Sequence, residues 1–142
     1  MATKIGKTAN GDALHYSVGV IIKQYGKFLL IDRTTEPFGF AVLAGHVNEN
    51  ETPEVALVRI VDEESGLKIV SHHQEYEGEV QGNWCNRGIG VHYWYVYECE
   101  VSGDPILVVT KAKSIGWYTP EEVRKLKLDP AVHYWFKKIK LI

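Results

Sequence analysis

The sequence predicts an α+β domain, and three observations lead to this prediction. Short segments rich in Val, Ile, Leu and Phe come first, one strongly capped helix follows, and further strand-like segments precede two helices near the end. Because strands and helices do not alternate along the chain, a doubly wound parallel sheet is not expected. A length of 142 residues suits one domain, residues 1–142, with one hydrophobic core.

The first two apolar segments predict a β-hairpin. Residues 17–22 and 27–33 are rich in β-branched and large apolar side chains, and the turn-like sequence KQYG separates them. A third short apolar segment, residues 38–43, leads through Ala44 and Gly45 into the polar loop HVNENE. These segments are therefore expected to form the first strands of a sheet.

Residues 53–65 carry clear start and stop signals of a helix. Thr52 can cap the helix, Pro53 suits its first position, and Gly66 is a fitting end. The apolar face expected to meet the core consists of Leu57, Val58 and Val61. Ala56, Ile60 and Glu63 are expected on another face, with Glu64 beside them.

The second half of the chain predicts two long strands, a short strand and two helices. Residues 68–81 are expected to be extended, and residues 92–101 alternate, with the odd-numbered tyrosines on one side and Trp94 and Val96 on the other. A short strand is expected at residues 115–118. The first of the two helices is expected to begin at a capping box formed by Thr119 and Glu122. The second is expected to begin at Asp129-Pro130, and its apolar stripe consists of Val132, Trp135, Phe136 and Ile139.

Composition excludes several broad classes. The net charge of -2 gives no general attraction to nucleic acid or to acidic membranes, so neither is expected as a partner. Two cysteines, Cys85 and Cys99, make neither a disulfide framework nor a metal cluster, and a reducing cytoplasm is the simplest location. The first residues lack the apolar core of a signal peptide, and the apolar runs are far shorter than the roughly 20 residues of a membrane helix.

The end of the first helix is acidic. Carboxylates such as those of Glu63 and Glu64 are hard oxygen ligands suited to Mg²⁺ or Mn²⁺. Two adjacent carboxylates repel each other, and a cation placed between them and a phosphate relieves that repulsion. The alternative is a solvated helix end, because glutamates are usually exposed.

The spacing of the surrounding residues adds a resemblance. Residues 45–67, GHVNENETPEVALVRIVDEESGL, resemble the signature of the Nudix hydrolases, G-x5-E-x7-R-E-U-x-E-E-x-G-U with U aliphatic. The positions that match are Gly45, Glu51, Arg59, Val61, Glu63, Glu64, Gly66 and Leu67. The one departure is Ile60, which stands where the signature has a glutamate. The flanking segments VGVIIKQYGKFLLIDR, FAVLAGH and IGWYTPEEV also resemble the family.

The resemblance implies a Nudix-type α/β/α sandwich with a mixed sheet and a loop–helix–loop that carries the signature. It implies hydrolysis of a nucleoside diphosphate linked to another moiety, with Mg²⁺ or Mn²⁺ as cofactor. Glu63 and Glu64 would be the catalytic residues and, with the carbonyl of Gly45, the metal ligands. Glu51 and Arg59 would brace the loop against the helix, which suits ligands that must be held rigidly. Many relatives form dimers, so a homodimer is compatible with the resemblance.

Ile60 leaves two hypotheses open. Residues 60, 63 and 64 are neighbours on a helix, and isoleucine can neither bind a cation nor take a proton. In the first, the chain is a hydrolase with a reduced metal site, for which Glu75, Glu77 or Glu79 could supply a base. In the second, it is a Nudix-fold protein that binds a nucleotide-like ligand or regulates a partner. Asp62 is a poor substitute, because it points to another face.

Several residues are candidates for substrate binding. Trp84 could stack on a base and Arg87 could contact a phosphate, while Phe40 and Tyr118 could line the pocket. Lys111 and Lys113 could hold a phosphate or be solvated. His46 is expected on a surface loop. No zinc constellation is expected, since His72 and His73 are adjacent in a predicted strand and point to opposite faces.

Overall fold

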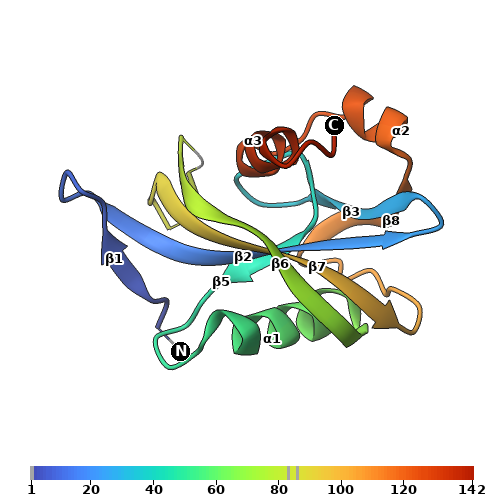
Figure 1. The fold of residues 1–142 in the computed structure, drawn as a ribbon, viewed down its shortest axis with the longest axis horizontal. Coiled ribbons are helices and arrows are strands. Elements are labelled where there is room, and N and C mark those ends of the chain that lie inside the picture. Colours follow the sequence, from blue (N-terminus) through green and yellow to red (C-terminus); the bar gives the residue numbers. More distant parts are fainter. Residues whose placement is uncertain (1, 83, 86) are drawn as a thin grey trace.

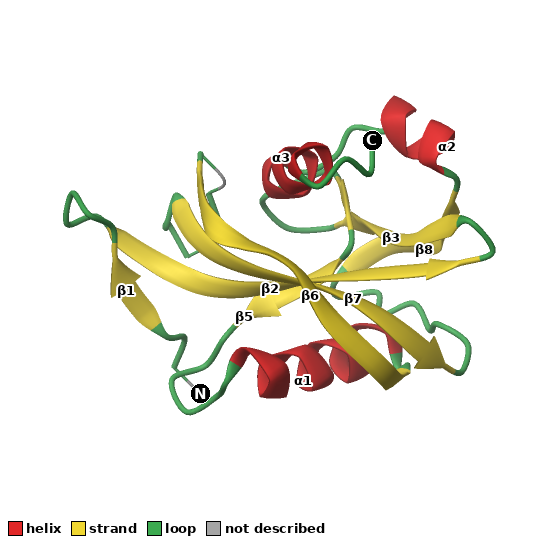
Figure 2. Ribbon diagram, viewed as in Figure 1, coloured by secondary structure: helices red, strands yellow, loops and turns green. Residues whose placement is uncertain are grey.

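The computed structural model describes residues 2–82, 84–85 and 87–142, and it shows a mixed β-sheet between two helical layers (Figure 1). Helix α1 covers one face, and α2 and α3 lie on the opposite side (Figure 2). The elements are β1 (Ile5–Lys7), β2 (Ala13–Gln24), β3 (Lys27–Arg33), β4 (Phe40–Ala41), β5 (Leu43–His46), α1 (Pro53–Ser65), β6 (Lys68–Gln81), β7 (Val91–Ser102), β8 (Ala112–Tyr118), α2 (Pro120–Lys125) and α3 (Pro130–Lys138). The predicted α/β/α sandwich with a mixed sheet is confirmed.

Strand β2 is the centre of the sheet. It pairs in parallel with β7, so that His15 to Ile22 lie opposite His92 to Cys99, and it pairs antiparallel with β1, β3 and β5. The order through the sheet is β4-β3-β2-β7-β6, with β8 beside β3. The predicted hairpin is confirmed as β2 and β3, although β2 begins before and ends after the predicted segment.

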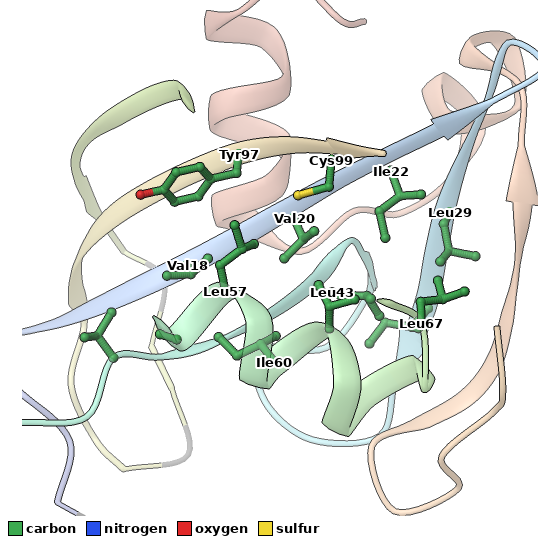
Figure 3. Close-up of a cluster of buried hydrophobic side chains, with 14 of the residues drawn as sticks. Val18, Val20, Ile22, Leu29, Leu43, Leu57, Ile60, Leu67, Tyr97 and Cys99 are labelled. Atoms are coloured by element: carbon green, nitrogen blue, oxygen red, sulfur yellow. The ribbon is translucent and has the colours of Figure 1, made fainter. Parts of the chain in front are cut away.

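Alternation along the strands divides the core into two clusters. Side chains of β2 such as Val18 and Val20 face α1, whereas Ile21 faces the side of α3. Figure 3 shows the α1-side cluster, with Leu57 and Ile60 of the helix among side chains of the sheet. On the other side, the buried side chains of α3 are Ala131, Val132, Trp135 and Phe136.

Helix α1 has the predicted caps but a different buried face. Thr52 accepts a hydrogen bond from the Val55 amide, and Gly66 ends the helix with a left-handed φ of 72°. The prediction that Val58 meets the core is wrong, because its side chain is 56% exposed. The residues buried on this helix are Ala56, Leu57, Ile60, Val61 and Ser65. Val58 lies about 100° round the helix from its neighbour Leu57 and therefore points away from the sheet. Ile60 packs into the core in place of Val58.

The C-terminal helices begin as predicted. Thr119 and Glu122 form the capping box of α2, and Asp129 accepts the Val132 amide at 2.8 Å as the cap of α3. None of the helices within the described residues combines the length and the apolar character needed to cross a membrane.

Candidate active site

A cavity of about 380 Å³ opens beside the C-terminal half of α1. One part of its wall carries the carboxylates of Glu63 and Glu64 together with Gly45. Other parts of the wall carry cationic side chains, namely Arg33, Arg59, Arg87 and Lys111. The cavity therefore brings together groups that bind a cation and groups that attract an anion.

Arg59 fixes the loop before α1 to the helix. Its Nε and Nη2 donate to the two carboxylate oxygens of Glu51 at 2.7 and 2.9 Å, which is a bidentate pair. Nη2 also donates to the carbonyl of His46 at 2.8 Å, and Glu51 accepts the Asn48 amide. These bonds hold the pKa of Glu51 below its usual range, with the Arg59 hydrogen bond as the largest cause. The sequence-predicted pair is thus in contact.

Glu63 and Glu64 differ in their surroundings. Glu63 is exposed and accepts from Nη1 of Arg59 at 3.2 Å, while Glu64 is half-buried and accepts the Ala44 amide at 3.2 Å. Burial raises the pKa of Glu64 to about 7, although the Ala44 bond and the charges of Arg33 and Lys111 oppose that shift. A charged carboxylate is therefore costly at this place unless a cation lies beside it.

Ile60 lies on the same wall as the two glutamates and also in the core. Its side chain is 1% exposed, and it packs with Leu57 in the cluster of Figure 3. A Cβ added to Gly45 would lie 3.0 Å from Cγ1 and 3.1 Å from Cδ1 of Ile60. The absence of a side chain at Gly45 thus leaves room for Ile60, and an apolar group occupies the position between the metal-ligand candidates.

The other acidic residues considered from the sequence do not reach the cavity. Asp62 is exposed and pairs with Lys68, as its place on the helix predicts. Glu75, Glu77 and Glu79 lie on β6, and none of them is among the described residues that line the cavity. Glu77 instead accepts a hydrogen bond from the hydroxyl of Tyr93 at 2.6 Å.

Of the four sequence-predicted substrate residues, Arg87 lines the cavity. Phe40 and Tyr118 pack edge to face against each other at the α3-side cluster, and Trp84 is a loop side chain that is 60% exposed. None of these three is among the described residues of the cavity wall. Spacing alone could not separate them, because each position depends on long-range packing.

Lys111 and Lys113 differ in their position relative to the cavity. Lys111 lines the cavity, whereas Lys113 is exposed on β8 and is not among the described lining residues. Arg33, at the end of β3, donates from Nε to the carbonyl of Pro37 at 2.8 Å and also lines the cavity. Sequence reasoning missed Arg33, although its position at a strand end was a signal that could have indicated it.

Asp129 is a second residue that sequence reasoning placed only as a cap. It is buried, it lines the cavity, and burial raises its pKa to about 6. It therefore combines a structural bond at the start of α3 with a position on the cavity wall.

A cluster of three histidines and a cysteine was missed altogether. His15 and His92 are buried, and Cys85 and His46 lie beside them. Their four candidate ligand atoms all lie within 4.8 Å of one another. The prediction that His46 is a surface loop residue is wrong, because it is the last residue of β5 and is only partly exposed.

Burial keeps the histidines of this cluster neutral. It is the largest cause that lowers the pKa of His46 to about 3 and that of His92 to about 4, and neighbouring histidines lower both further. The pKa of His15 is also lowered, by burial and by the charge of Arg87. Local sequence gave no signal for this cluster, because its members come from β2, β5, β7 and the segment before β7.

The residues of the acidic wall fit a divalent metal ion. Two carboxylates and a backbone carbonyl are hard oxygen donors, and an ion such as Mg²⁺ keeps several waters in addition to a few protein ligands. The raised pKa of Glu64 is the observation that supports this fit, because a cation beside it would stabilise its charged form.

The cavity wall thus carries carboxylates and cationic side chains together, beside a helix that an arginine braces against the preceding loop. The chain belongs to the NUDIX domain family, which matches residues 13–139. Members of this family are generally pyrophosphohydrolases and typically use a divalent metal ion.

Individual relatives agree with this assignment. A MutT-like protein from Streptomyces ambofaciens is 32% identical over 106 residues, which are 74% of this chain and 63% of the relative. The chain therefore spans less than two thirds of the length of that relative.

Solved structures show the same fold. A MutT NUDIX hydrolase from Burkholderia pseudomallei has a TM-score of 0.75 with 22% identity, and the match covers 85% of this chain and 94% of that one. A MutT protein from Methanosarcina mazei has a TM-score of 0.74 with 21% identity over 89% and 93% of the two chains. The NUDIX domain of Shewanella oneidensis NrtR, solved in complex with ADP ribose, has a TM-score of 0.71 with 17% identity over 95% and 92%.

Proposed function

We propose that this chain hydrolyses the pyrophosphate bond of a nucleoside diphosphate linked to another moiety. The observation that carries the proposal is the shared cavity, which the carboxylates of Glu63 and Glu64 line together with the cationic side chains of Arg33, Arg87 and Lys111. A diphosphate is an anion that needs both a metal ion and cationic side chains to be held. The ADP ribose bound by the related NrtR domain supports this substrate class.

Each residue of the acidic wall has a role in this proposal. The carbonyl of Gly45 and the carboxylates of Glu63 and Glu64 would hold Mg²⁺ or Mn²⁺, and a bound ion would supply polarisation of phosphorus and offset charge on the leaving oxygen. Arg59 and Glu51 keep the loop and helix in register, so that the carbonyl and the two carboxylates stay on one wall. Glu63 and Glu64 are the proposed catalytic residues.

A hydrolysis panel tests the proposal. Purified protein is incubated with nucleoside triphosphates, ADP-ribose, NADH, nucleotide sugars and dinucleoside polyphosphates, each with Mg²⁺, Mn²⁺ or chelator, and the products are separated by anion exchange. Metal-dependent cleavage that falls at least about a hundredfold in Glu64→Gln supports the proposal. Glutamine can still accept the Ala44 amide, and Glu79→Gln, an exposed change on β6, is the matched control.

Ile60 supports a second candidate function. An isoleucine fills the space beside Glu63 and Glu64 and cannot bind metal, so the cavity can also serve as a binding site for a nucleotide-like ligand without turnover. Calorimetric titration of ADP-ribose and of a nucleoside diphosphate distinguishes the two functions. If one of these ligands binds, and no compound of the panel is cleaved with either metal, the binding function is favoured.

A further inference from the structure

The cluster of His15, His46, Cys85 and His92 lies outside the acidic wall but next to it. His15 and His92 are direct partners in the parallel pair of β2 and β7, so their backbones are fixed at adjacent positions. His46 ends β5, which pairs with β2 two residues further along. Three of the four ligands are therefore held by the sheet itself.

The fourth residue comes from the segment between β6 and β7. The Cys85 amide donates to the carbonyl of Ile89 at 3.1 Å, and the Gly88 amide donates to the carbonyl of Cys85 at 3.0 Å. These bonds hold Cys85 beside Gly88 and Ile89, and Cys85 is 9% exposed. The thiol thus lies against the histidines rather than in solvent.

Two of the six separations between the ligand atoms are close to those around a tetrahedral zinc ion. Nε2 of His46 and Nε2 of His92 are 3.4 Å apart, and Sγ of Cys85 and Nδ1 of His15 are 3.9 Å apart. With Zn–N bonds of about 2.0–2.1 Å and a Zn–S bond of about 2.3 Å, the edges of a tetrahedron are roughly 3.3–3.6 Å. The His46–His92 separation already matches such an edge, and the Cys85–His15 separation is a few tenths of an ångström longer. The other four separations are at most 4.8 Å and need to shorten by no more than about 1.5 Å.

From these positions we propose that His15, His46, Cys85 and His92 form a four-coordinate site for a zinc-class metal ion. Imidazole nitrogen and thiolate sulfur are borderline and soft ligands, which select Zn²⁺ over Mg²⁺. On binding, the thiol would release its proton to solvent and the thiolate would bond to the metal, which leaves a net charge of +1 on the complex of the ion with its four ligands. Four protein ligands leave no open position, so this site is structural rather than catalytic.

The proposed site has a consequence for the cavity. His46, Cys85 and His92 line the same cavity as Gly45 and Glu64, and Arg87 stands two residues after the cysteine that the ion would hold. The zinc ion would thus tie the segment that carries Arg87 to the sheet. The oxygen donors of the acidic wall and the nitrogen and sulfur donors of this cluster would then take two different metals side by side.

Cobalt is the probe for this site, because tetrahedral Co²⁺ is coloured and its bond to a thiolate gives a separate charge-transfer band in the near ultraviolet. The full chain is purified without added metal and its zinc content is measured, then the chelator-treated protein is titrated with Co²⁺ in excess Mg²⁺. We expect one equivalent of tetrahedral Co²⁺ with a thiolate band. Zn²⁺ should displace the Co²⁺, and excess Mg²⁺ should not.

Variants assign the spectrum to these residues. Cys85→Ser should abolish the thiolate band and weaken Co²⁺ binding at least about tenfold, and His92→Gln should weaken it similarly. Cys99→Ser, at the other buried cysteine, and His73→Gln, in the exposed group of His73, Glu75 and Glu98 on β6 and β7, are the matched controls and should bind as the parent does.

Three results would overturn the proposal: no tetrahedral spectrum at one equivalent, a spectrum unchanged by Cys85→Ser, or binding lost in His73→Gln instead. None of these readouts depends on hydrolysis, so the site and the proposed activity can fail separately. If a variant lacks the parent's circular dichroism spectrum, the zinc content and the Co²⁺ spectrum of the parent protein decide the proposal.

Discussion

Replacement of Ile60 by glutamate places a third carboxylate on the acidic wall. Positions 60, 63 and 64 are spaced i, i+3 and i+4, so the new side chain lies beside both glutamates. Ile60 also fills the core next to Gly45, and the substitution therefore has a cost in stability as well as an expected gain in metal binding.

The cost follows from the position of the side chain. Ile60 is 1% exposed, and loss of a fully buried isoleucine costs about 1.5–3 kcal/mol. A carboxyl group at the same place, beside Glu64, must take up a proton or remain poorly solvated, which adds on the order of 1–3 kcal/mol. We expect Ile60→Glu to lose about 3–5 kcal/mol without metal, out of the roughly 5–15 kcal/mol typical of a domain.

A divalent ion should return part of this loss. A ligand that binds only the folded state at 100 times its dissociation constant stabilises it by about 2.7 kcal/mol. The assay is urea unfolding of the wild type, Ile60→Glu and Ile60→Gln, each with and without Mg²⁺. Glutamine matches the size and polarity of glutamate but lacks its charge, so Ile60→Gln should gain less from Mg²⁺. Under saturating Mg²⁺ the turnover of Ile60→Glu should exceed that of the wild type at least about tenfold.

The reasoning would be refuted by equal responses of the two variants to Mg²⁺. That result would mean that position 60 does not approach the metal. A gain in Mg²⁺ stabilisation without any gain in turnover would keep the geometry but reject the view that a missing carboxylate limits the activity.

Three further predictions concern other residues of the wall. Burial raises the pKa of Asp129 to about 6, so its stabilising contribution is complete below about pH 4 and is lost as the pH rises through 6. Asp129→Asn keeps the acceptor for the Val132 amide. At about pH 8 the variant should be more stable than the wild type by up to about 3 kcal/mol, and at about pH 4 it should not be. The same difference in unfolding free energy at both pH values would contradict this prediction. Gly45→Ala should lower the free energy of unfolding by about 1–3 kcal/mol, because the new Cβ lies 3.0 Å from Ile60. Most of that loss should vanish in an Ile60→Ala background. Additive effects of the two substitutions in denaturant unfolding would disprove the contact. Arg59→Lys loses the bidentate pair with Glu51 and should lower the free energy of unfolding by about 1–3 kcal/mol. It should also weaken Mn²⁺ binding, measured by titration. An unchanged melting temperature would count against the role of Arg59 in holding the loop to the helix.

Features that depend on local sequence were predictable. Caps at Thr52 and Gly66 set the ends of α1 because they act within one turn, and the capping box before α2 did the same. Val58 was assigned wrongly because its position on the helix is intermediate, and only packing against the sheet decides which neighbouring face is buried. Ile60 was recognised as a departure from the signature, but its role in the core was not.

Features that depend on distant segments were not predictable from one sequence. Arg33 and Asp129 reach the cavity from β3 and from the start of α3, and no short motif joins them to α1. The cluster around His92 requires the parallel register of β2 and β7, which hydrophobic alternation does not specify. The signature indicated the acidic wall, whereas the cationic walls and the histidine cluster needed the fold.

The parallel pair of β2 and β7 also has a consequence for the time course of folding. The two strands lie far apart along the chain, and β6 can pair with β7 only once β7 is present. Pairing of distant segments requires closing a long loop, and the chain loses conformational entropy before the new contacts stabilise it. Such pairings therefore slow folding. During synthesis, β2 and the hairpin with β3 would leave the ribosome long before β7 does. Until β7 arrives, one long edge of β2 has no partner, and this edge is where premature association of nascent chains is most expected.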